Sequence, residues 1–458
     1  LCAAVPKHMD TAEVPKKLTM NLFRVKDNRT LPKNDFASVR NIVNRIADKT
    51  LRELEQEGVF VFPEKINDAS DIEEEQVILQ SYNACYRTSN IMGFVGYGNE
   101  SIAIESRFSS GEKDYFFQYL LERVMGFPNV VDLGVHANQG NGLFDLLLFL
   151  FPRYLKDALR KGLFKTYIRN KYNDSRVSGS IDIPRHIAQN TPFVGNIAYS
   201  RREYSYDNSL TELVRHTIEF IRRKPYGRQL LSKVKEEVTS IIDVTPGYRF
   251  HDRQKVITVN QKAPIRHAYY REYRNLQYLC LLILRHQKNQ IGTASKELYG
   301  ILFDGAWLWE EYINLLVGDI FYHPMNKANQ GAQRLFAGNT GLIYPDFISR
   351  DSRYRMIGDA KYKPAANIGN KDYLQVLAYM LRFDAKKGFY FYPSTNGVQK
   401  QYLWVNEGST YENNVKARED LCVIKLGLGI PESCGSYKEF AYEMDNAGAV
   451  FKAVLFDS

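Results

Sequence analysis

The sequence contains few cysteines and no apolar stretch of membrane-spanning length. Its five cysteines among 458 residues are scattered without a Cys-x-x-Cys pair, and its histidines form no His-Glu-x-x-His motif. This spacing argues against a zinc site or a disulfide framework. The apolar run at residues 146–151 ends at Pro152 and is too short to cross a bilayer. Because no secretory signal is recognised either, we expect a cytoplasmic protein that makes no membrane contact.

Two further features are absent from the sequence. No long tract rich in Pro, Gly and Ser occurs, so extensive disorder is not expected. The chain also has no Gly-x4-Gly-Lys-Ser/Thr loop, which argues against an NTP-hydrolysing motor of the P-loop type. A chain of 458 residues exceeds one ordinary core, so two or three domains are expected.

Positive charge is concentrated in the middle of the chain. The whole sequence carries a net charge of +9, and residues 201–275 contain 16 Lys and Arg residues against nine Asp and Glu residues. A basic segment with interleaved aromatic residues suits a nucleic-acid backbone, whereas a solvated helix face is the alternative interpretation. The candidate DNA-binding residues are Arg222, Arg223, Lys224, Arg271 and Arg274, with Lys363 further along the chain.

The hydrophobic pattern predicts a mixed α/β (α+β) protein. Helical spacing occurs at residues 36–57, 142–161, 209–222 and 268–286, and strand patterns at residues 59–62 and, as a pair of strands, at 90–108. We therefore expect three consecutive parts: an N-terminal mixed α/β domain at 10–195, a helical basic region at 196–295, and a C-terminal domain with a mixed sheet flanked by helices at 296–458.

The C-terminal part alternates between helical and strand patterns. The expected elements are a helix at 298–321, strands at 341–349 and 353–361, a helix at 371–383 and a strand at 388–392, with a possible extra strand near 334–337. A tight polar turn around Ser352 separates the first two strands, so we expect them to pair as a hairpin.

The predicted hairpin gathers acidic and basic side chains. Asp359 and Lys361 are two residues apart and point to the same face of their strand. Asp346 directly follows Pro345 in the preceding strand and can converge on Asp359 near the open end of the hairpin. Two such carboxylates repel each other unless a cation lies between them, and Mg²⁺, for which Mn²⁺ can substitute, prefers oxygen ligands.

This arrangement suits phosphodiester hydrolysis. Asp346 and Asp359 would hold the metal ion, and Lys361 would orient or deprotonate the attacking water or neutralise charge on the phosphate. Glu310 could add a third carboxylate through water, and Gln375 could hold the nucleophile or a phosphate. The structural alternatives are a solvated strand edge for Asp359 and Lys361, a turn or capping role for Asp346, and a surface role for Glu310 or its neighbour Glu311.

These motifs resemble a known family. Tyr344-Pro345-Asp346 followed by Asp359-Ala360-Lys361-Tyr362-Lys363 resembles the PD-(D/E)XK nuclease signature. The helix starting Asp372-Tyr373-Leu374-Gln375 resembles the McrC branch, the nuclease subunit of McrBC-type restriction systems. Upstream stretches add to the likeness, which covers about residues 85–395: Trp309-Glu310-Glu311-Tyr312, Ser178-Gly179-Ser180-Ile181-Asp182 with Tyr206-Asp207-Asn208, and Thr88-Ser89-Asn90 through Ser106-Arg107-Phe108. Residues 10–84 exceed what matches the family.

The resemblance implies a Mg²⁺-dependent DNA endonuclease of the type IV restriction class that acts in antiviral defence. It also implies a McrB-like AAA+ partner, a hexamer that hydrolyses GTP or ATP, with the N-terminal domain of this chain docking into the ring and stimulating it. A double-strand break further suggests that two nuclease domains dimerise on DNA. The alternatives are a docking and activating module that does not cut, or another PD-(D/E)XK nuclease such as a junction resolvase or transposase.

Overall fold

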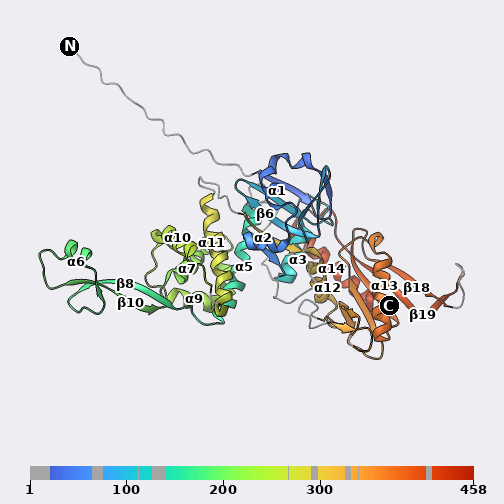
Figure 1. The fold of residues 1–458 in the computed structure, drawn as a ribbon. Helices are drawn as coiled ribbons and strands as arrows, with labels where there is room; N and C mark the ends of the chain where they lie inside the picture. The colour runs from blue at the N-terminus through green and yellow to red at the C-terminus, as the bar shows by residue number, and fades with distance from the viewer. Residues whose placement is uncertain are drawn as a thin grey trace, which may run out of the picture. The chain divides into compact units, whose positions relative to one another are not determined.

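A computed structural model of the chain describes the residues in nine segments: 21–63, 76–111, 113–125, 141–266, 268–289, 298–324, 332–338, 340–408 and 415–457. The fold is mixed α/β, as predicted (Figure 1). Contacts divide the described residues into two compact units, one within residues 145–294 and the other within residues 19–144 and 295–458. None of the helices in the described segments has the length and apolar character needed to cross a membrane.

This division differs from the three consecutive parts expected from the sequence. The expected boundary between residues 195 and 196 would separate two strands that pair along their whole length, Thr166–Asp174 and Ile197–Ser205. The segment at 19–144 and the segment at 295–458 belong to one unit, which is therefore discontinuous in sequence. Residues 10–20 of the first expected domain lie outside the described residues.

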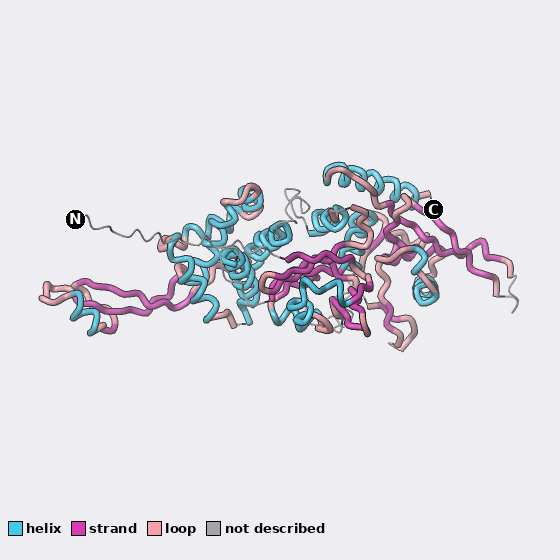
Figure 2. The backbone as a smooth tube through the Cα atoms, turned by 90° about the horizontal axis from the view of Figure 1, so that it is seen from above, coloured by secondary structure: helices cyan, strands magenta, loops and turns pink. Residues whose placement is uncertain are grey.

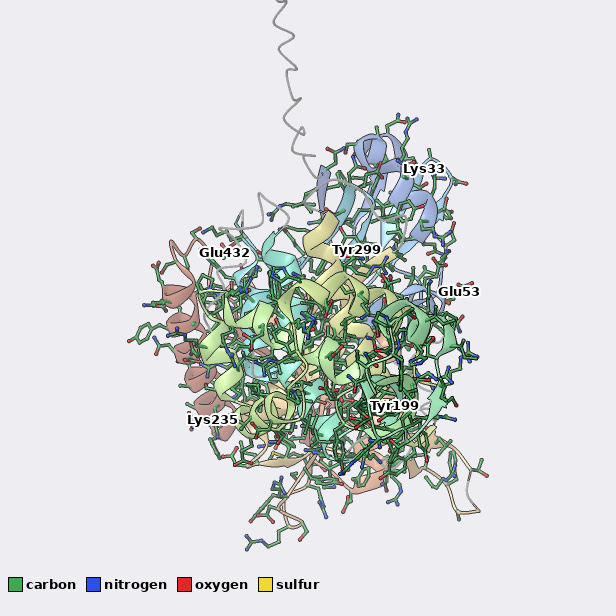
Figure 3. The ribbon with its side chains drawn as sticks, turned by 90° about the vertical axis from the view of Figure 1, so that its left-hand side faces the viewer. Lys33, Glu53, Tyr199, Lys235, Tyr299 and Glu432 are labelled. Atoms are coloured by element: carbon green, nitrogen blue, oxygen red, sulfur yellow. The ribbon has the colours of Figure 1, made fainter. Side chains whose placement is uncertain are left out.

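The N-terminal half of the discontinuous unit is built on a five-stranded sheet of order β1-β7-β6-β11-β3. These strands are β1 (Asn21–Lys26), β3 (Val59–Phe62), β6 (Ile91–Tyr97), β7 (Glu100–Glu105) and β11 (Leu298–Asp304). A three-stranded sheet, β2-β5-β4, and short helices belong to the same half: β2 (Thr30–Pro32), β4 (Leu79–Tyr82), β5 (Cys85–Thr88), η1 (Lys33–Val39), α1 (Arg40–Ile46), α2 (Leu51–Glu57) and α3 (Tyr115–Met125). Figure 3 labels three side chains of this half: Lys33, Glu53 and Tyr299.

Strand β11 corrects one sequence prediction. Residues 298–321 were expected to form one helix, but they form β11 followed by α12 (Gly305–Val317). An unbroken apolar run fits a buried strand as well as a buried helix, and here β6 and β3 flank the segment on both sides. Asp304 ends the strand and starts the helix, because its carboxylate accepts hydrogen bonds from the N–H groups of Ala306 and Trp307 at 2.8 and 3.2 Å.

The C-terminal half of the same unit contains a six-stranded sheet of order β12-β15-β16-β17-β19-β18. Its strands are β12 (Phe321–Tyr322), β15 (Phe347–Ser349), β16 (Met356–Ala360), β17 (Lys387–Ser394), β18 (Gln399–Asn406) and β19 (Ala417–Gly429). The accompanying elements are β13 (Gln333–Arg334), β14 (Leu342–Ile343), η6 (Ala365–Asn367), α13 (Asn370–Phe383) and α14 (Tyr437–Phe456). The strand expected at 341–349 is thus two short strands, and β17 continues through Pro393.

Helices cover both faces of this sheet. On one face, Val376 and Met380 of α13 form a core with Ile357 of β16 and Tyr390 of β17. On the other face, the indole N–H of Trp309 in α12 donates to the carbonyl of Phe391 at 2.9 Å. Phe451 of α14 contacts the Phe391 ring there, with 5.7 Å between centroids. Strands β16 and β17 are therefore buried on both faces along most of their length, whereas the edge strand β18 is largely exposed.

The other unit is mainly helical, as predicted for the middle of the chain. Its helices are α5 (Asn141–Leu159), which extends into this unit from residue 145, α7 (Ser209–Arg222), α8 (Gly227–Ser232), α9 (Lys235–Asp243), η3 (Phe250–Asp252), α10 (Arg253–Lys262), η4 (Ala268–Tyr270) and α11 (Arg271–Asn289). A long ribbon not foreseen from the sequence extends from them, formed by β8 (Thr166–Asp174) and β10 (Ile197–Ser205), with β9 (Ser180–Ile181) and α6 (Ile183–Gln189) near its end (Figure 2).

Candidate functional site

The predicted hairpin forms the frame of the site. Strands β15 and β16 pair antiparallel with Phe347 opposite Gly358, and extension by one pair places Asp346 opposite Asp359. The Asp346 carboxylate accepts a hydrogen bond from the backbone N–H of Ala360 at 2.8 Å. This bond fixes the Asp346 side chain at the carboxyl end of β16. The convergence expected from the sequence is therefore present.

Asp359 and Lys361 lie together on the face of the sheet that α13 covers. Asp359 is 1% exposed, and its Oδ2 atom is 2.6 Å from Nζ of Lys361. The backbone N–H of Lys361 donates to the carbonyl of Phe391 at 2.9 Å, which continues the β16–β17 pairing beyond the end of the strand. The two side chains thus occupy the same-face positions that strand alternation predicts.

Helix α13, which packs on this face of the sheet, contacts the Lys361 side chain. Nζ of Lys361 donates to Oε1 of Gln375 at 3.2 Å. The amide of Gln375 in turn donates to the hydroxyl of Tyr379 at 2.6 Å, and this hydroxyl donates to the backbone carbonyl of Tyr344 at 3.2 Å. Gln375 therefore contacts Lys361, and its expected role of holding the nucleophile or a phosphate stays a prediction. Tyr379 was missed in the sequence analysis. Tyr379 lies four residues after Gln375, which places both side chains on one face of the helix, and this spacing could have identified Tyr379 from the sequence.

A second acidic residue of α13, Asp372, also belongs to the site. Its Oδ1 atom is 3.7 Å from Nζ of Lys361, and its Oδ2 atom is 2.7 Å from Nζ of Lys363. Burial opposes ionisation of Asp372, but hydrogen bonds from Lys363 and the Gly369 N–H lower its pKa below the usual range. Lys363, a candidate for DNA contact, is thus paired with a carboxylate beside Lys361.

Glu310 approaches the site from α12 together with a histidine that the sequence analysis did not select. Nε2 of His323 is 3.5 Å from Oε1 of Glu310 and 3.9 Å from Oε1 of Glu311. Its Nδ1 atom donates to the backbone carbonyl of Asp346 at 2.7 Å. Burial lowers the pKa of His323, but hydrogen bonds to Glu311 and Asp346 and the charges of Glu310 and Glu311 outweigh it and raise the value to about 9.

The electrostatics of the site favour a bound cation. Burial is the main cause that raises the pKa of Asp346, followed by the charge of Glu310. Burial likewise raises the pKa of Asp359, and the charge of Asp346 adds to it. Burial alone would lower the pKa of Lys361, but the surrounding carboxylates raise it, so the ammonium form is stabilised. A divalent cation would relieve the repulsion between the acids.

The donor set fits such a cation only in part. Oδ2 of buried Asp359 accepts no well-formed hydrogen bond from the described residues, although Lys361 is close, and a carboxylate oxygen of this kind is a suitable Mg²⁺ ligand. Within the described segments, however, no three Asp, Glu, His or Cys side chains converge closely enough to hold a metal ion as they stand. Metal binding by Asp346 and Asp359, with a contribution of Glu310 through water, stays a prediction.

The remaining DNA-binding candidates belong to the other unit. Arg222 pairs with Glu219 at 2.9 Å near the end of α7, and the guanidinium of Arg223 lies 4.6 Å from the centre of the Phe250 ring. Arg274 donates to the carbonyl of Ile265 at 3.0 Å near the start of α11. Lys224 follows Arg223, and Arg271 is exposed at the first position of α11. Their role in DNA binding stays a prediction.

Solved structures similar to this chain include two assemblies from Thermococcus gammatolerans. The first is a half-complex from a tetradecameric assembly of McrB AAA+ hexamers with bound McrC; the identity is 16% and the TM-score 0.46, with 93% of this chain and 100% of that chain covered. The second is the McrBC complex, with 15% identity, a TM-score of 0.30, and coverage of 65% of this chain and 87% of that chain. No curated protein matches the sequence.

The family assignment comes from a sequence profile. The profile described as McrBC 5-methylcytosine restriction system component matches residues 86–393, about two thirds of the chain. The matched range includes Glu310, Asp346, Asp359, Lys361 and Gln375. The resemblance inferred from the motifs is thereby confirmed: the chain belongs to the family of McrBC restriction system components.

Proposed function

We propose that this chain is the cleavage subunit of a McrBC-type restriction system, a Mg²⁺-dependent DNA endonuclease that acts with an AAA+ partner. The observation that supports it most strongly is the junction of Asp346, Asp359 and Lys361 at the carboxyl end of β16. Paired buried carboxylates beside an ammonium group suit metal-assisted hydrolysis of a phosphodiester. The family membership supplies the context of a multi-protein restriction system.

Each residue of the site has a defined task in this proposal. Asp346 and Asp359 would hold the divalent cation, Mg²⁺ or Mn²⁺. Such a cation would supply a water of lowered pKa and stabilise negative charge on the phosphate. Lys361 presents its ammonium group to the nucleophile or to the phosphate oxygens. Gln375 and Tyr379 keep this ammonium group in place, and His323 anchors the Asp346 backbone.

The proposal predicts a specific loss of cutting when the lysine is removed. Lys361→Ala lowers the rate of DNA cleavage by the assembled complex by about a hundredfold or more, because the ammonium group is lost where charge develops. Plasmid nicking is measured over a titration of Mg²⁺ or Mn²⁺. Lys371→Ala, an exposed lysine at the start of α13, is the matched control and keeps the wild-type rate.

The same assay separates cutting from partner activation. If the chain only docks and activates its partner, Lys361→Ala leaves both NTP hydrolysis and any DNA cleavage unchanged. If the proposed function is correct, the variant still stimulates NTP hydrolysis by the partner while cleavage is lost. Wild-type cutting by Lys361→Ala contradicts the assignment.

A further inference from the structure

A large cavity opens beside the candidate site in the discontinuous unit. Its volume is about 740 Å³, within the range of sites that bind organic ligands. The turn after β1 lines it with Asn28 and Arg29, and the segment after the catalytic strand lines it from Pro364 to Asn367. Residues of the β17–β18 connection complete the wall. Segments far apart in the sequence therefore build one cavity.

The cavity adjoins the catalytic edge of the sheet. Its segment at Pro364 begins three residues after Lys361, and Tyr392 in its wall follows Phe391, the residue whose carbonyl binds the Lys361 N–H. Both segments leave the carboxyl ends of the parallel strands β16 and β17, where open α/β sheets bind ligands. The η6 segment is fixed there by Lys425, whose Nζ donates to the carbonyl of Ala365 at 3.2 Å.

The charge of the cavity wall favours an anion. Its lining includes two arginines and one lysine but no Asp or Glu. Arg107 is neutralised by buried Asp27 at 2.8 Å, and the ammonium group of Lys400 donates to the carbonyl of Val454 at 3.3 Å. Arg29 is exposed, and its guanidinium makes no ion pair with the described residues. Arg29 is therefore the cation of the wall that is available to a ligand.

Uncharged hydrogen-bonding groups make up much of the remaining wall. Five amide side chains line the cavity, and four of them are exposed: Asn367, Asn396, Gln399 and Gln401. Asn and Gln amides bind both phosphate oxygens and the edges of bases. One free guanidinium among several amides thus matches a phosphodiester chain better than a cationic or purely apolar ligand.

We propose that this cavity holds the backbone of the DNA strand next to the phosphodiester that is cut, with Arg29 bound to a phosphate and the amides to neighbouring sugar–phosphate and base atoms. This inference rests on the proposed function of the adjoining site. It assigns part of DNA binding to the turn after β1, far from the nuclease motifs in sequence.

Arg29→Ala tests the proposal directly. Binding of a fluorescent duplex to the full chain is measured by anisotropy at several salt concentrations, with Ca²⁺ in place of Mg²⁺ so that binding is read separately from cutting. We expect the affinity to fall by about threefold to tenfold, and the slope of log affinity against log salt to decrease in magnitude by about one, because one phosphate contact is lost. Arg29→Lys keeps the slope, since it keeps the charge.

Two further variants sharpen the result. A double variant, Gln399→Ala with Gln401→Ala, lowers the affinity without changing the salt slope, because amides release no counterions. Lys438→Ala, an exposed lysine of α14 outside the cavity, leaves both quantities at wild-type values. Wild-type affinity and slope in Arg29→Ala overturn the proposal even if the wild type cuts DNA. The proposal is also overturned if Arg29 is needed to bind a mononucleotide but not to bind DNA. Failure of the wild type to cut DNA with any divalent ion contradicts the proposed function instead.

Discussion

At the scale of single residues, the site is organised by charges that compensate one another. Lys361 contacts Asp359, Asp372 and Gln375 with the same ammonium group. Asp346 and Asp359 lie near it with raised pKa values because they are buried near further negative charge. The ammonium group thus partly replaces the positive charge that a metal ion would contribute, which lets the chain fold with its acids in place.

Asp27, in the turn after β1, shows a similar balance. It is fully buried and pairs with Arg107, whose backbone N–H and guanidinium both donate to it. Burial outweighs these favourable contacts and raises the pKa of Asp27 to about 6. The folded state therefore binds more protons than the unfolded state between the ordinary Asp pKa of 3.8 and the raised pKa of about 6. This group's contribution to stability falls as the pH rises through that window.

The direction of this pH dependence gives a prediction for Asp27→Asn. The variant is less stable than the wild type at pH 5, because an amide N–H₂ group replaces one of the two oxygens that accept hydrogen bonds from Arg107. The difference shrinks by about 1 kcal/mol at pH 7.5, where the wild type carries a buried charge. Urea unfolding at the two pH values measures the gap. Asp35→Asn, at an exposed site in η1, shows no such change. An equal gap at the two pH values means that the pKa of this carboxyl group is not raised by folding.

At the scale of elements, β11 connects the two halves of the discontinuous unit. It pairs with β6 on one side and β3 on the other and passes without a loop into α12, the helix that carries Glu310. Gly300 permits the close pairing with β6, because a Cβ atom there would lie 2.4 Å from the backbone carbonyl oxygen of Phe94. A backbone atom cannot move aside as a flexible side chain can.

Gly300→Ala is therefore expected to lower the free energy of unfolding by about 1–3 kcal/mol through overpacking. Because β11 leads into α12, we also expect reduced DNA cleavage at temperatures where this unit begins to unfold. Gly408→Ala is the matched control, since a Cβ atom at Gly408 meets no other atom within 4 Å. Denaturant unfolding of the two variants measures the difference, and equal midpoints for both disprove the packing argument.

At the scale of the whole molecule, the chain consists of two units with separate cores. One is discontinuous and carries the candidate site, and the other holds the basic helices and the β8–β10 ribbon. Leu213 of α7 is completely buried in the second unit. Loss of such a side chain destabilises the residues that pack on it. In many proteins the domains of one chain unfold as separate cooperative units, so the effect stays within one domain.

Leu213→Ala is expected to lower the free energy of unfolding of the unit at residues 145–294 by about 2–5 kcal/mol. The stability of the other unit should not change. Hydrogen–deuterium exchange with peptide resolution should show lost protection in that segment only. Gly300→Ala should show the converse pattern, confined to residues 19–144 and 295–458. Lost protection throughout the chain in either variant indicates a single cooperative unit.

The local features of the site could be predicted from sequence because they depend on neighbours along the chain. Strand alternation places Asp359 and Lys361 on one face, and the short polar turn brings Asp346 opposite Asp359. The helix that carries Gln375 follows from its periodic apolar residues. Each of these inferences needs only the geometry of one strand, one turn or one helix.

Tertiary structure decided what depends on distant partners. Residues 298–304 form a strand because β6 and β3 offer open edges, although their own pattern also fits a helix. Tyr379, Asp372 and His323 join the site through packing of α13 and α12 on the sheet, and the cavity near Arg29 exists only where the turn after β1 meets the end of β17. The sequence by itself determined the arrangement of Asp346, Asp359 and Lys361, since their spacing is local, whereas burial and long-range pairing determined what surrounds them.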